Sequence, residues 1–218
     1  FKERKIKNNL MRIGGFKEEE IPMLPIIGME EPWRYRNKAQ FPFGMNKNGE
    51  IITGFYAGRT HDIIENEDCL LGVQENRGIL EIIKAFMKEY RIRPYDEKSH
   101  QGLVRHALIR KGFKSGEIMV CLVINGKRLP HGEELVKRLS AVSGMTSISY
   151  SINEEKTNVI MGKEIVNLYG PGYITDSISD VTYQISPLSF YQVNPVQTEK
   201  LYGTALEYAG LTGKETVW

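Results

Sequence analysis

The stretch LVRHALIRKGFKSGEIMVCLVIN, residues 103–125, decides the fold because it predicts two strands joined by a short turn. Residues 103–111 and 117–125 are rich in the aliphatic side chains that strands favour, and glycine, lysine and serine fill the connection between them. The run from Ile118 to Ile124 is apolar on both faces, which is typical of a strand buried on both sides. Cys121 lies in this run and is predicted to be a packed core thiol.

Hairpins and helices continue on both sides of this stretch. Their predicted positions are strands at residues 33–43 and 51–56, a helix at 79–90, a helix at 133–142, and strands at 147–152, 159–161, 165–168 and 173–185. Hairpins outnumber units in which a helix connects two strands. The sequence therefore predicts an α+β fold, with a largely antiparallel sheet and flanking helices.

Both ends of the chain look like parts of longer elements. Residues 1–13 predict a helix, and the proline-containing segment 19–32 predicts an irregular connection. Asn194 and Pro195 predict the start of a second helix, which Gly210 closes. Residues 215–218 then resemble the beginning of a strand, and a strand start alone buries nothing. We therefore expect this sequence to be a fragment of a longer protein.

Composition excludes several classes of protein. With 218 residues, of which 41% are hydrophobic and 26% charged, the chain can bury a sizeable core and is not disordered, collagen-like or repetitive. The formal net charge of +2 does not by itself indicate a nucleic-acid or membrane binder. Two distant cysteines, Cys69 and Cys121, provide no disulfide framework, so a cytoplasmic location is expected. Because no apolar run reaches the ~18 residues of a membrane span, no membrane partner is expected.

The small net charge hides a clustered distribution. Residues 84–114 contain nine basic and three acidic side chains. A second cluster, WRYRNK at residues 33–38, alternates aromatic with basic residues, so a strand there would place Arg34, Arg36 and Lys38 on one face. Such a row could follow RNA phosphates, and guanidinium groups could also stack on bases. The alternative is an ordinary solvated strand face.

The segment SPLSFYQVNP, residues 186–195, precedes the predicted C-terminal helix. In it, Phe190 supplies an aromatic face, and Gln192 supplies a carboxamide with one acceptor and two donors. This pair could read the edge of a uracil or hold the polar groups of a cofactor. Ordinary packing and helix capping are the alternative.

Five segments carry a resemblance to a known family. They are YRNKAQF (35–41), GFYAGRTHDIIENEDC (54–69), RHALIRKG (105–112), LVINGKRLP (122–130) and SPLSFYQVNP (186–195). With these segments the chain resembles the S-adenosylmethionine-dependent RNA uracil-5-methyltransferases, and the bacterial 23S ribosomal RNA branch more than the transfer RNA branch. The resemblance implies a central RNA-contacting α+β domain at residues 1–186. Residues 187–218 would begin a Rossmann-like methyltransferase domain that contains the first helix and the start of a strand.

The resemblance also implies roles for individual residues. The substrate contacts would be Phe190, Arg34, Arg36, Lys38, Arg105 and Arg110, and the cofactor contact would be Gln192. In the family, the catalytic cysteine and the carboxylate base lie downstream, so no catalytic residue and no activity are expected in the isolated chain. Cys69 would be the fourth ligand of a 4Fe-4S cluster in the whole protein, with no cluster expected in this chain. A non-catalytic RNA-binding or ribosome-assembly module with the same central fold is the alternative.

Overall fold

The computed structural model describes residues 1–66 and 68–217 of the chain. Tertiary contacts divide it after Glu31 into a short N-terminal unit and a unit that begins at Pro32. In the N-terminal unit, α1 (Lys2–Arg12) is followed by the 3-10 turn η1 (Glu18–Glu20), and the Lys7 ammonium contacts the Glu18 carboxylate at 2.6 Å. The domain boundary predicted between residues 186 and 187 stays a prediction.

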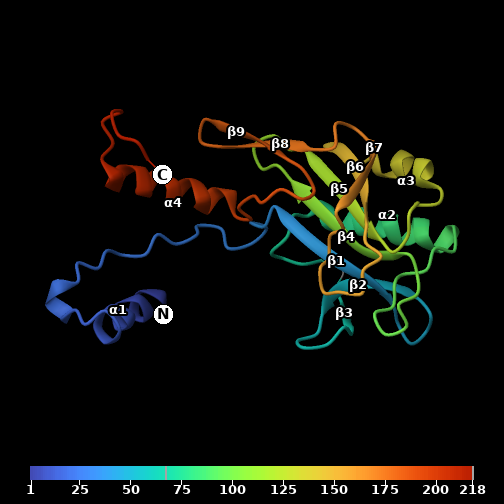
Figure 1. Cartoon of the computed structure of the whole chain (residues 1–218), viewed down its shortest axis with the longest axis horizontal. Helices are drawn as coiled ribbons and strands as arrows, with labels where there is room; N and C mark the ends of the chain where they lie inside the picture. The colour runs from blue at the N-terminus through green and yellow to red at the C-terminus, as the bar shows by residue number, and fades with distance from the viewer. Residues whose placement is uncertain (67, 218) are drawn as a thin grey trace. The chain divides into compact units, whose positions relative to one another are not determined.

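A seven-stranded sheet forms the larger unit, in the order β3-β2-β1-β4-β5-β6-β7 (Figure 1). The strands are β1 (Lys38–Met45), β2 (Ile51–Tyr56), β3 (Ile63–Glu65), β4 (Val104–Lys111), β5 (Ile118–Ile124), β6 (Met145–Ile152) and β7 (Glu164–Tyr169). All neighbouring pairs are antiparallel except β5 and β6, which are parallel and are connected through α3 (Gly132–Leu139). The prediction of an α+β fold with a largely antiparallel sheet is confirmed.

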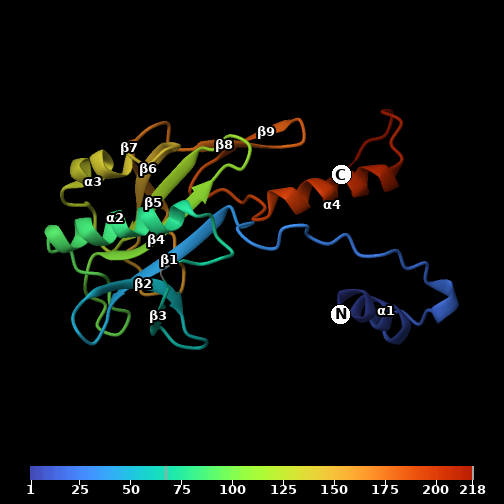
Figure 2. The same ribbon diagram turned by 180° about the vertical axis from the view of Figure 1, so that it is seen from behind.

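Helices cover one face of the sheet. Figure 2 shows α2 (Glu75–Glu89) and α3 in front of the strands. Helical periodicity brings Ile79, Ile83 and Phe86 to one side of α2, where all three are fully buried in the main core. Strand periodicity brings alternate residues of β1, β4 and β5 to meet them. This packing fixes the strands whose ends carry the sites described below.

The opposite face of the sheet is partly polar and is nevertheless buried. His106, Arg110 and Ser149 are each at most 3% exposed there. A two-stranded hairpin, β8 (Ile174–Ile178) and β9 (Val181–Ile185), contributes a smaller apolar cluster in which Met119 and Tyr191 also take part. Arg105 of β4 donates to the carbonyls of Asn153 and Glu155 in the connection between β6 and β7, and this joins the connection to the sheet.

The C-terminal helix α4 (Pro195–Ala209) has the ends that the sequence predicted. The Asn194 side chain accepts a hydrogen bond from the Gln197 amide at 3.1 Å, and Pro195 occupies the first turn. Gly210 closes the helix with a φ of 55°. The strand predicted to start at residue 215 is absent over the described residues 215–217, and Trp218 lies outside the described residues.

Besides the strand start at residue 215, three predicted strands differ from the observed ones, and one observed strand has no predicted counterpart. The strand predicted from residue 33 begins only at Lys38, because Arg34 adopts a left-handed φ of 55°. The strand predicted at 159–161 is a loop, since the Asn153 side-chain amide donates hydrogen bonds to the carbonyls of Val159 and Ile160. Residues 173–185 form two strands, with the chain reversing near Ser179, where φ is 51°. The short strand β3 was not predicted.

In the part of the chain that the structure describes, no helix has both the length and the hydropathy that crossing a membrane would take.

Candidate nucleic-acid interface

The segment of residues 186–194, called here the linking segment, is bound to the start of β1. Asn37 donates twice to it, from its backbone amide to the Val193 carbonyl at 3.0 Å and from its side-chain amide to the Gln192 carbonyl at 2.8 Å. Arg110 of β4 reaches the same segment and donates to the carbonyl of Ser189. These bonds fix the backbone on both sides of Phe190.

Tyr191 anchors the linking segment from the other side. Its ring is 7% exposed and packs in the apolar cluster beneath the β8–β9 hairpin. Its hydroxyl donates to Asp176 at 3.3 Å, and the carboxylate of Asp176 also accepts the backbone amides of Phe113 and Lys114. Burial and the neighbouring Asp176 carboxylate raise the pKa of Tyr191, so the hydroxyl stays protonated and donates.

Phe190 points away from this anchored backbone. Its side chain is 87% exposed, although its neighbour Tyr191 is buried. An exposed phenyl ring on a fixed backbone can stack on a nucleobase at a low cost in entropy. Gln192 is half-buried, and its backbone carbonyl is held by Asn37. The two residues that the sequence singled out therefore lie on one well-anchored segment.

Positive charge gathers beside the linking segment. Lys38 pairs in register with Arg110 across β1 and β4, and Arg36 comes just before β1. Partial burial, followed by repulsion from Arg110 and Arg36, lowers the pKa of Lys38. An anion bound here would relieve this repulsion. Burial alone lowers the pKa of Arg110 to about 10, so Arg110 is still charged at neutral pH.

A cavity of about 330 Å³ lies next to these cations. Its lining includes Arg36, Lys38 and Gln40 from one side, and Phe55 and Cys69 from the other. Two cations, an amide and an aromatic ring form a suitable surface for a nucleotide, because they offer phosphate neutralisation, an edge-reading group and a stacking face.

The structure corrects the predicted cationic face. Arg34, Arg36 and Lys38 do not line one strand face, because Arg34 lies in a bend before β1. The Arg34 guanidinium turns to the Asp68 carboxylate, which it contacts at 2.5 Å, and to the Cys69 carbonyl at 3.0 Å. Its charge is therefore largely compensated within the protein.

Arg105 and Arg110, which the resemblance implies as substrate contacts, are buried. They are 2% and 3% exposed, and both bind main-chain carbonyls. Arg105 in addition contacts Glu97 at 3.3 Å and lies over the Tyr95 ring at 4.4 Å. Buried cations need such partners, and RNA reaches neither group without local rearrangement.

Of the two cysteines, Cys69 lies at the candidate interface, whereas Cys121 is fully buried in β5. Among residues 1–66 and 68–217, no three His, Cys, Asp or Glu side chains are grouped so that they could hold a metal ion. A cluster with four thiolate ligands therefore does not fit the described residues by themselves. The role of Cys69 as an iron–sulfur ligand in the whole protein stays a prediction.

The sequence did not identify the residues that hold the linking segment. The alternation in residues 33–38 places Asn37 on the face away from the cations, and Tyr191 has no predicted role between Phe190 and Gln192. Both act through contacts with residues far along the chain, such as the pairs Asn37–Gln192 and Tyr191–Asp176. The only local signal was an asparagine between two cations.

Comparison with solved structures first identifies the class of fold. The chain matches the structure of Pyrococcus abyssi tRNA (uracil-54, C5)-methyltransferase, which was determined in complex with S-adenosyl-L-homocysteine. The TM-score is 0.72 at 24% identity, and the match covers 93% of this chain and 46% of that one. At this identity the likeness shows the shared fold alone.

Sequence relatives are more similar. The chain is 44% identical to a Clostridium tetani protein over 100% of its own length, and 45% identical to a Halalkalibacterium halodurans protein over the same share. A Staphylococcus aureus relative is 42% identical over 99% of the chain. All three are named uncharacterized RNA methyltransferases, and the chain spans about half of their length, 47% to 48%. A comparison with models of known protein families gives no match. The chain is thus homologous to part of a group of bacterial RNA methyltransferases.

Proposed function

We propose that this chain is the RNA-contacting part of an S-adenosylmethionine-dependent methyltransferase that modifies C5 of a uridine. Bacterial 23S ribosomal RNA is the proposed substrate, ahead of transfer RNA. The names of the relatives support RNA methylation, and the fold shared with a tRNA uracil methyltransferase is consistent with the uracil C5 position. The activity belongs to the whole protein, of which this chain supplies substrate contacts.

The observation that carries this proposal is the exposure of Phe190 on an anchored backbone. A phenyl ring that is 87% exposed buries almost no apolar surface, so packing does not explain it. The same backbone is held by Asn37, Arg110 and Tyr191, which keeps the ring in a defined position. We assign Phe190 to stacking on a base of the RNA.

Neighbouring residues fit supporting roles. Arg36 and Lys38 would neutralise phosphates beside the stacked base, because partial burial increases the strength of their interaction with anions. Gln192 would bind the edge of the target uracil or the polar groups of S-adenosylmethionine, which supplies the methyl group when bound. Arg34 and Arg110, which are engaged within the protein, would shape this surface from behind. Arg105 is engaged at the other end of β4, where it holds the connection between β6 and β7.

Uracil C5 needs activation by a nucleophile before it accepts a methyl group, and the described thiols do not fit that role. Cys121 is fully buried, and burial raises its pKa to about 11, so it is a neutral thiol at physiological pH. Cys69 lies among cations but has no general base among the groups that line its cavity. We therefore place the nucleophile outside this chain, in agreement with the resemblance.

The test uses the whole protein that contains this chain, with Phe190→Ala and Gln192→Ala as separate variants. We expect Phe190→Ala to weaken RNA binding by about 1–3 kcal/mol, since one stacked base is lost. Gln192→Ala should lower the rate of methyl transfer to RNA by ~10²-fold. Both variants should keep their stability within about 0.5 kcal/mol, measured by urea unfolding.

Leu188→Ala and Gln184→Ala are the matched controls, because both residues are exposed and lie close by in the sequence. They should bind and methylate RNA like the unsubstituted protein. If RNA binds through Phe190 but no methyl transfer occurs with S-adenosylmethionine, the chain belongs to a non-catalytic RNA-binding module. Full activity of Phe190→Ala and Gln192→Ala would refute the site assignment.

A further inference from the structure

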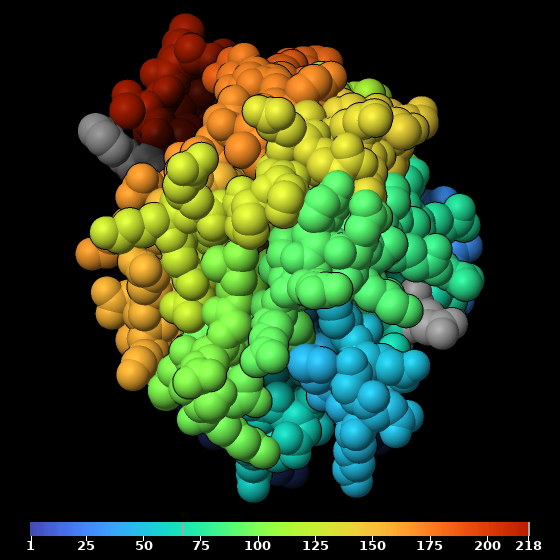
Figure 3. Space-filling model, turned by 90° about the vertical axis from the view of Figure 1, so that its right-hand side faces the viewer, coloured from blue at the N-terminus to red at the C-terminus, as the bar shows by residue number. Residues whose placement is uncertain are grey.

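A second cavity, of about 430 Å³, lies at the other end of β1, away from the linking segment. It is formed by the turn between β1 and β2, the C-terminal half of α2, and the residues that follow α2. Figure 3 shows these two parts of the chain side by side, the turn in blue and the helix in green. We call this cavity the α2 groove.

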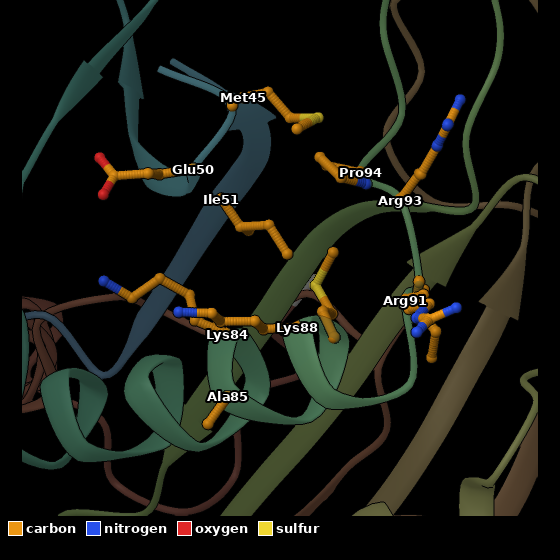
Figure 4. A pocket seen from close by; sticks show the side chains of 12 residues that line it. Met45, Glu50, Ile51, Lys84, Ala85, Lys88, Arg91, Arg93 and Pro94 are labelled. Carbon is orange, nitrogen blue, oxygen red and sulfur yellow. The ribbon is translucent and has the colours of Figure 1, made fainter. Parts of the chain in front are cut away.

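The floor of the α2 groove is apolar. Met45, Ile51 and Pro94 surround its centre (Figure 4), and the buried side chains of Met87 and Ile92 lie beneath them. Met45 is 53% exposed, although it is apolar and ends a core strand. An apolar floor of this kind can be covered by a nucleobase or a ribose.

Four cations flank this floor on two sides. Figure 4 shows Lys84 and Lys88 of α2 along one margin and Arg91 and Arg93 at the other. Lys88, Arg91 and Arg93 are exposed, and none of the four forms an ion pair with any residue in 1–66 or 68–217. The one acidic side chain of the lining, Glu50, already accepts a hydrogen bond from Asn46 at 2.8 Å.

Helix electrostatics explains only part of this cluster. α2 ends at Glu89, and cations near a helix C-terminus are favoured by about 0.3–1 kcal/mol each. This accounts for Lys88 in the last turn and for Arg91 just beyond it. Lys84 lies one turn earlier, and Arg93 lies in the following loop. The arrangement across both margins of an apolar floor therefore calls for an anionic ligand.

We propose that the α2 groove is a second RNA-binding surface, which holds a nucleotide over its apolar floor with phosphates between the lysine and arginine margins. This inference rests on the proposed function, because it takes RNA as the anion. β1 connects the two surfaces, since Lys38 begins it and Met45 ends it. Seven residue steps at ~3.3 Å separate Lys38 from Met45 by about 23 Å. Because seven is an odd number, the two side chains lie on opposite faces of the sheet, so an RNA strand that bound both surfaces would have to pass from one face to the other.

An acidic protein segment is the competing class of partner, and the apolar floor favours RNA over it. Acidic side chains carry their charge on flexible, non-planar stems, whereas each nucleotide presents a phosphate and a planar base in fixed succession. The groove likewise places an apolar floor between cations, from Lys84 across Ile51 to Arg93.

The test replaces one cation from each margin in the variant Lys84→Gln/Arg93→Gln of the full chain. Lys137→Gln/Lys163→Gln is the control, because both lysines are exposed, lie outside the groove and change the net charge equally. Affinity for a uridine-containing RNA hairpin is measured between low and physiological salt. We expect the groove variant to bind about tenfold more weakly at low salt, with a salt slope smaller by about 1.4, and the control to match the unsubstituted chain.

Phe190→Ala, measured on the same RNA, separates the two proposals. If Phe190→Ala weakens binding and the groove variant behaves like its control, the groove inference is wrong and the proposed function stands. If the unsubstituted chain does not bind RNA, both fail. Polyglutamate is the second probe, and binding of polyglutamate that depends on Lys84 and Arg93, with RNA affinity unchanged, would assign the groove to an acidic protein instead.

Discussion

Two pairs of arginines from the same basic stretch of sequence have opposite environments. Arg105 and Arg110 lie on β4 and are at most 3% exposed, and each donates to main-chain carbonyls of a distant segment. Arg91 and Arg93 lie just beyond α2, are exposed, and have no ion-pair partner among the described residues. The first pair holds segments of the fold together, and only the second is free to meet an external anion.

The difference shows that local charge is a poor guide to ligand contact until burial is known. A guanidinium has five donors, and burial is tolerated only when acceptors replace water. The loops beside β4 provide such acceptors as backbone carbonyls, whereas the end of α2 faces solvent. Three predictions test this contrast, and each compares a buried polar group with an exposed one of the same type.

The largest effect is expected for Arg110→Met. Met fills part of the volume but leaves the Ser189 carbonyl without its donor, so we expect a loss of about 3 kcal/mol in the free energy of unfolding. Urea unfolding at pH 7 measures it. Arg93→Met is the matched exposed control and should change stability by less than about 0.5 kcal/mol. Equal effects of the two substitutions would contradict the contrast.

An intermediate loss of stability is expected when the pH is lowered. His106 is 3% exposed, and burial lowers its pKa to about 4, from 6.5 for a free side chain. Between these values the unfolded chain binds more protons than the folded one, so stability falls as the pH falls. We expect protonation of His106 to lower the free energy of unfolding by about 2 kcal/mol between pH 7 and pH 4.5.

The measurement is the difference in this pH dependence between the unsubstituted chain and His106→Gln, which cannot take up the proton. Carboxylates titrate over part of the same range in both proteins and cancel in the difference. The same substitution at the exposed His131 provides the control for the effect of a histidine-to-glutamine change on stability at pH 7. Identical pH profiles for His106→Gln and the unsubstituted chain would show that His106 titrates normally.

The smallest effect is expected for Asp176→Asn. Each carboxylate oxygen of Asp176 accepts a backbone amide, from Phe113 at 3.0 Å and from Lys114 at 2.9 Å. Asn has only one acceptor oxygen, so one amide loses its partner at a cost of about 1–2 kcal/mol. Asp180 is exposed, so Asp180→Asn should cause no measurable loss of stability and serves as the control. If the Asp176→Asn variant is as stable as the unsubstituted chain, the two amide hydrogen bonds to this carboxylate add nothing measurable to stability.

Much of the fold could be predicted from sequence because its signals are local. The periodicity of Ile79, Ile83 and Phe86 indicated α2, and the doubly apolar run around Cys121 indicated a central strand. Asn194, Pro195 and Gly210 marked the two ends of α4. Each of these patterns reflects the geometry of one element, which a few neighbouring residues determine.

Two strand predictions were wrong because contacts with more distant residues override the local preference for a strand. Residues 33–37 have the alternation of a strand, but the Arg34 side chain turns to Asp68. Residues 159–161 include β-branched side chains typical of a strand, but the Asn153 side chain donates hydrogen bonds to the carbonyls of Val159 and Ile160. In both cases a partner far along the chain, or across a loop, offers a better set of hydrogen bonds than a neighbouring strand would.

For the candidate site, the sequence determined which side chains carry the chemistry: a phenyl ring, a carboxamide and a set of cations. The tertiary structure alone decided which of them face outward. It buried Arg105 and Arg110, left Phe190 exposed, and brought Lys84 and Lys88 opposite Arg91 and Arg93 across an apolar floor. The reason is physical. Charge and aromaticity belong to a residue, whereas exposure depends on what the rest of the chain packs against it.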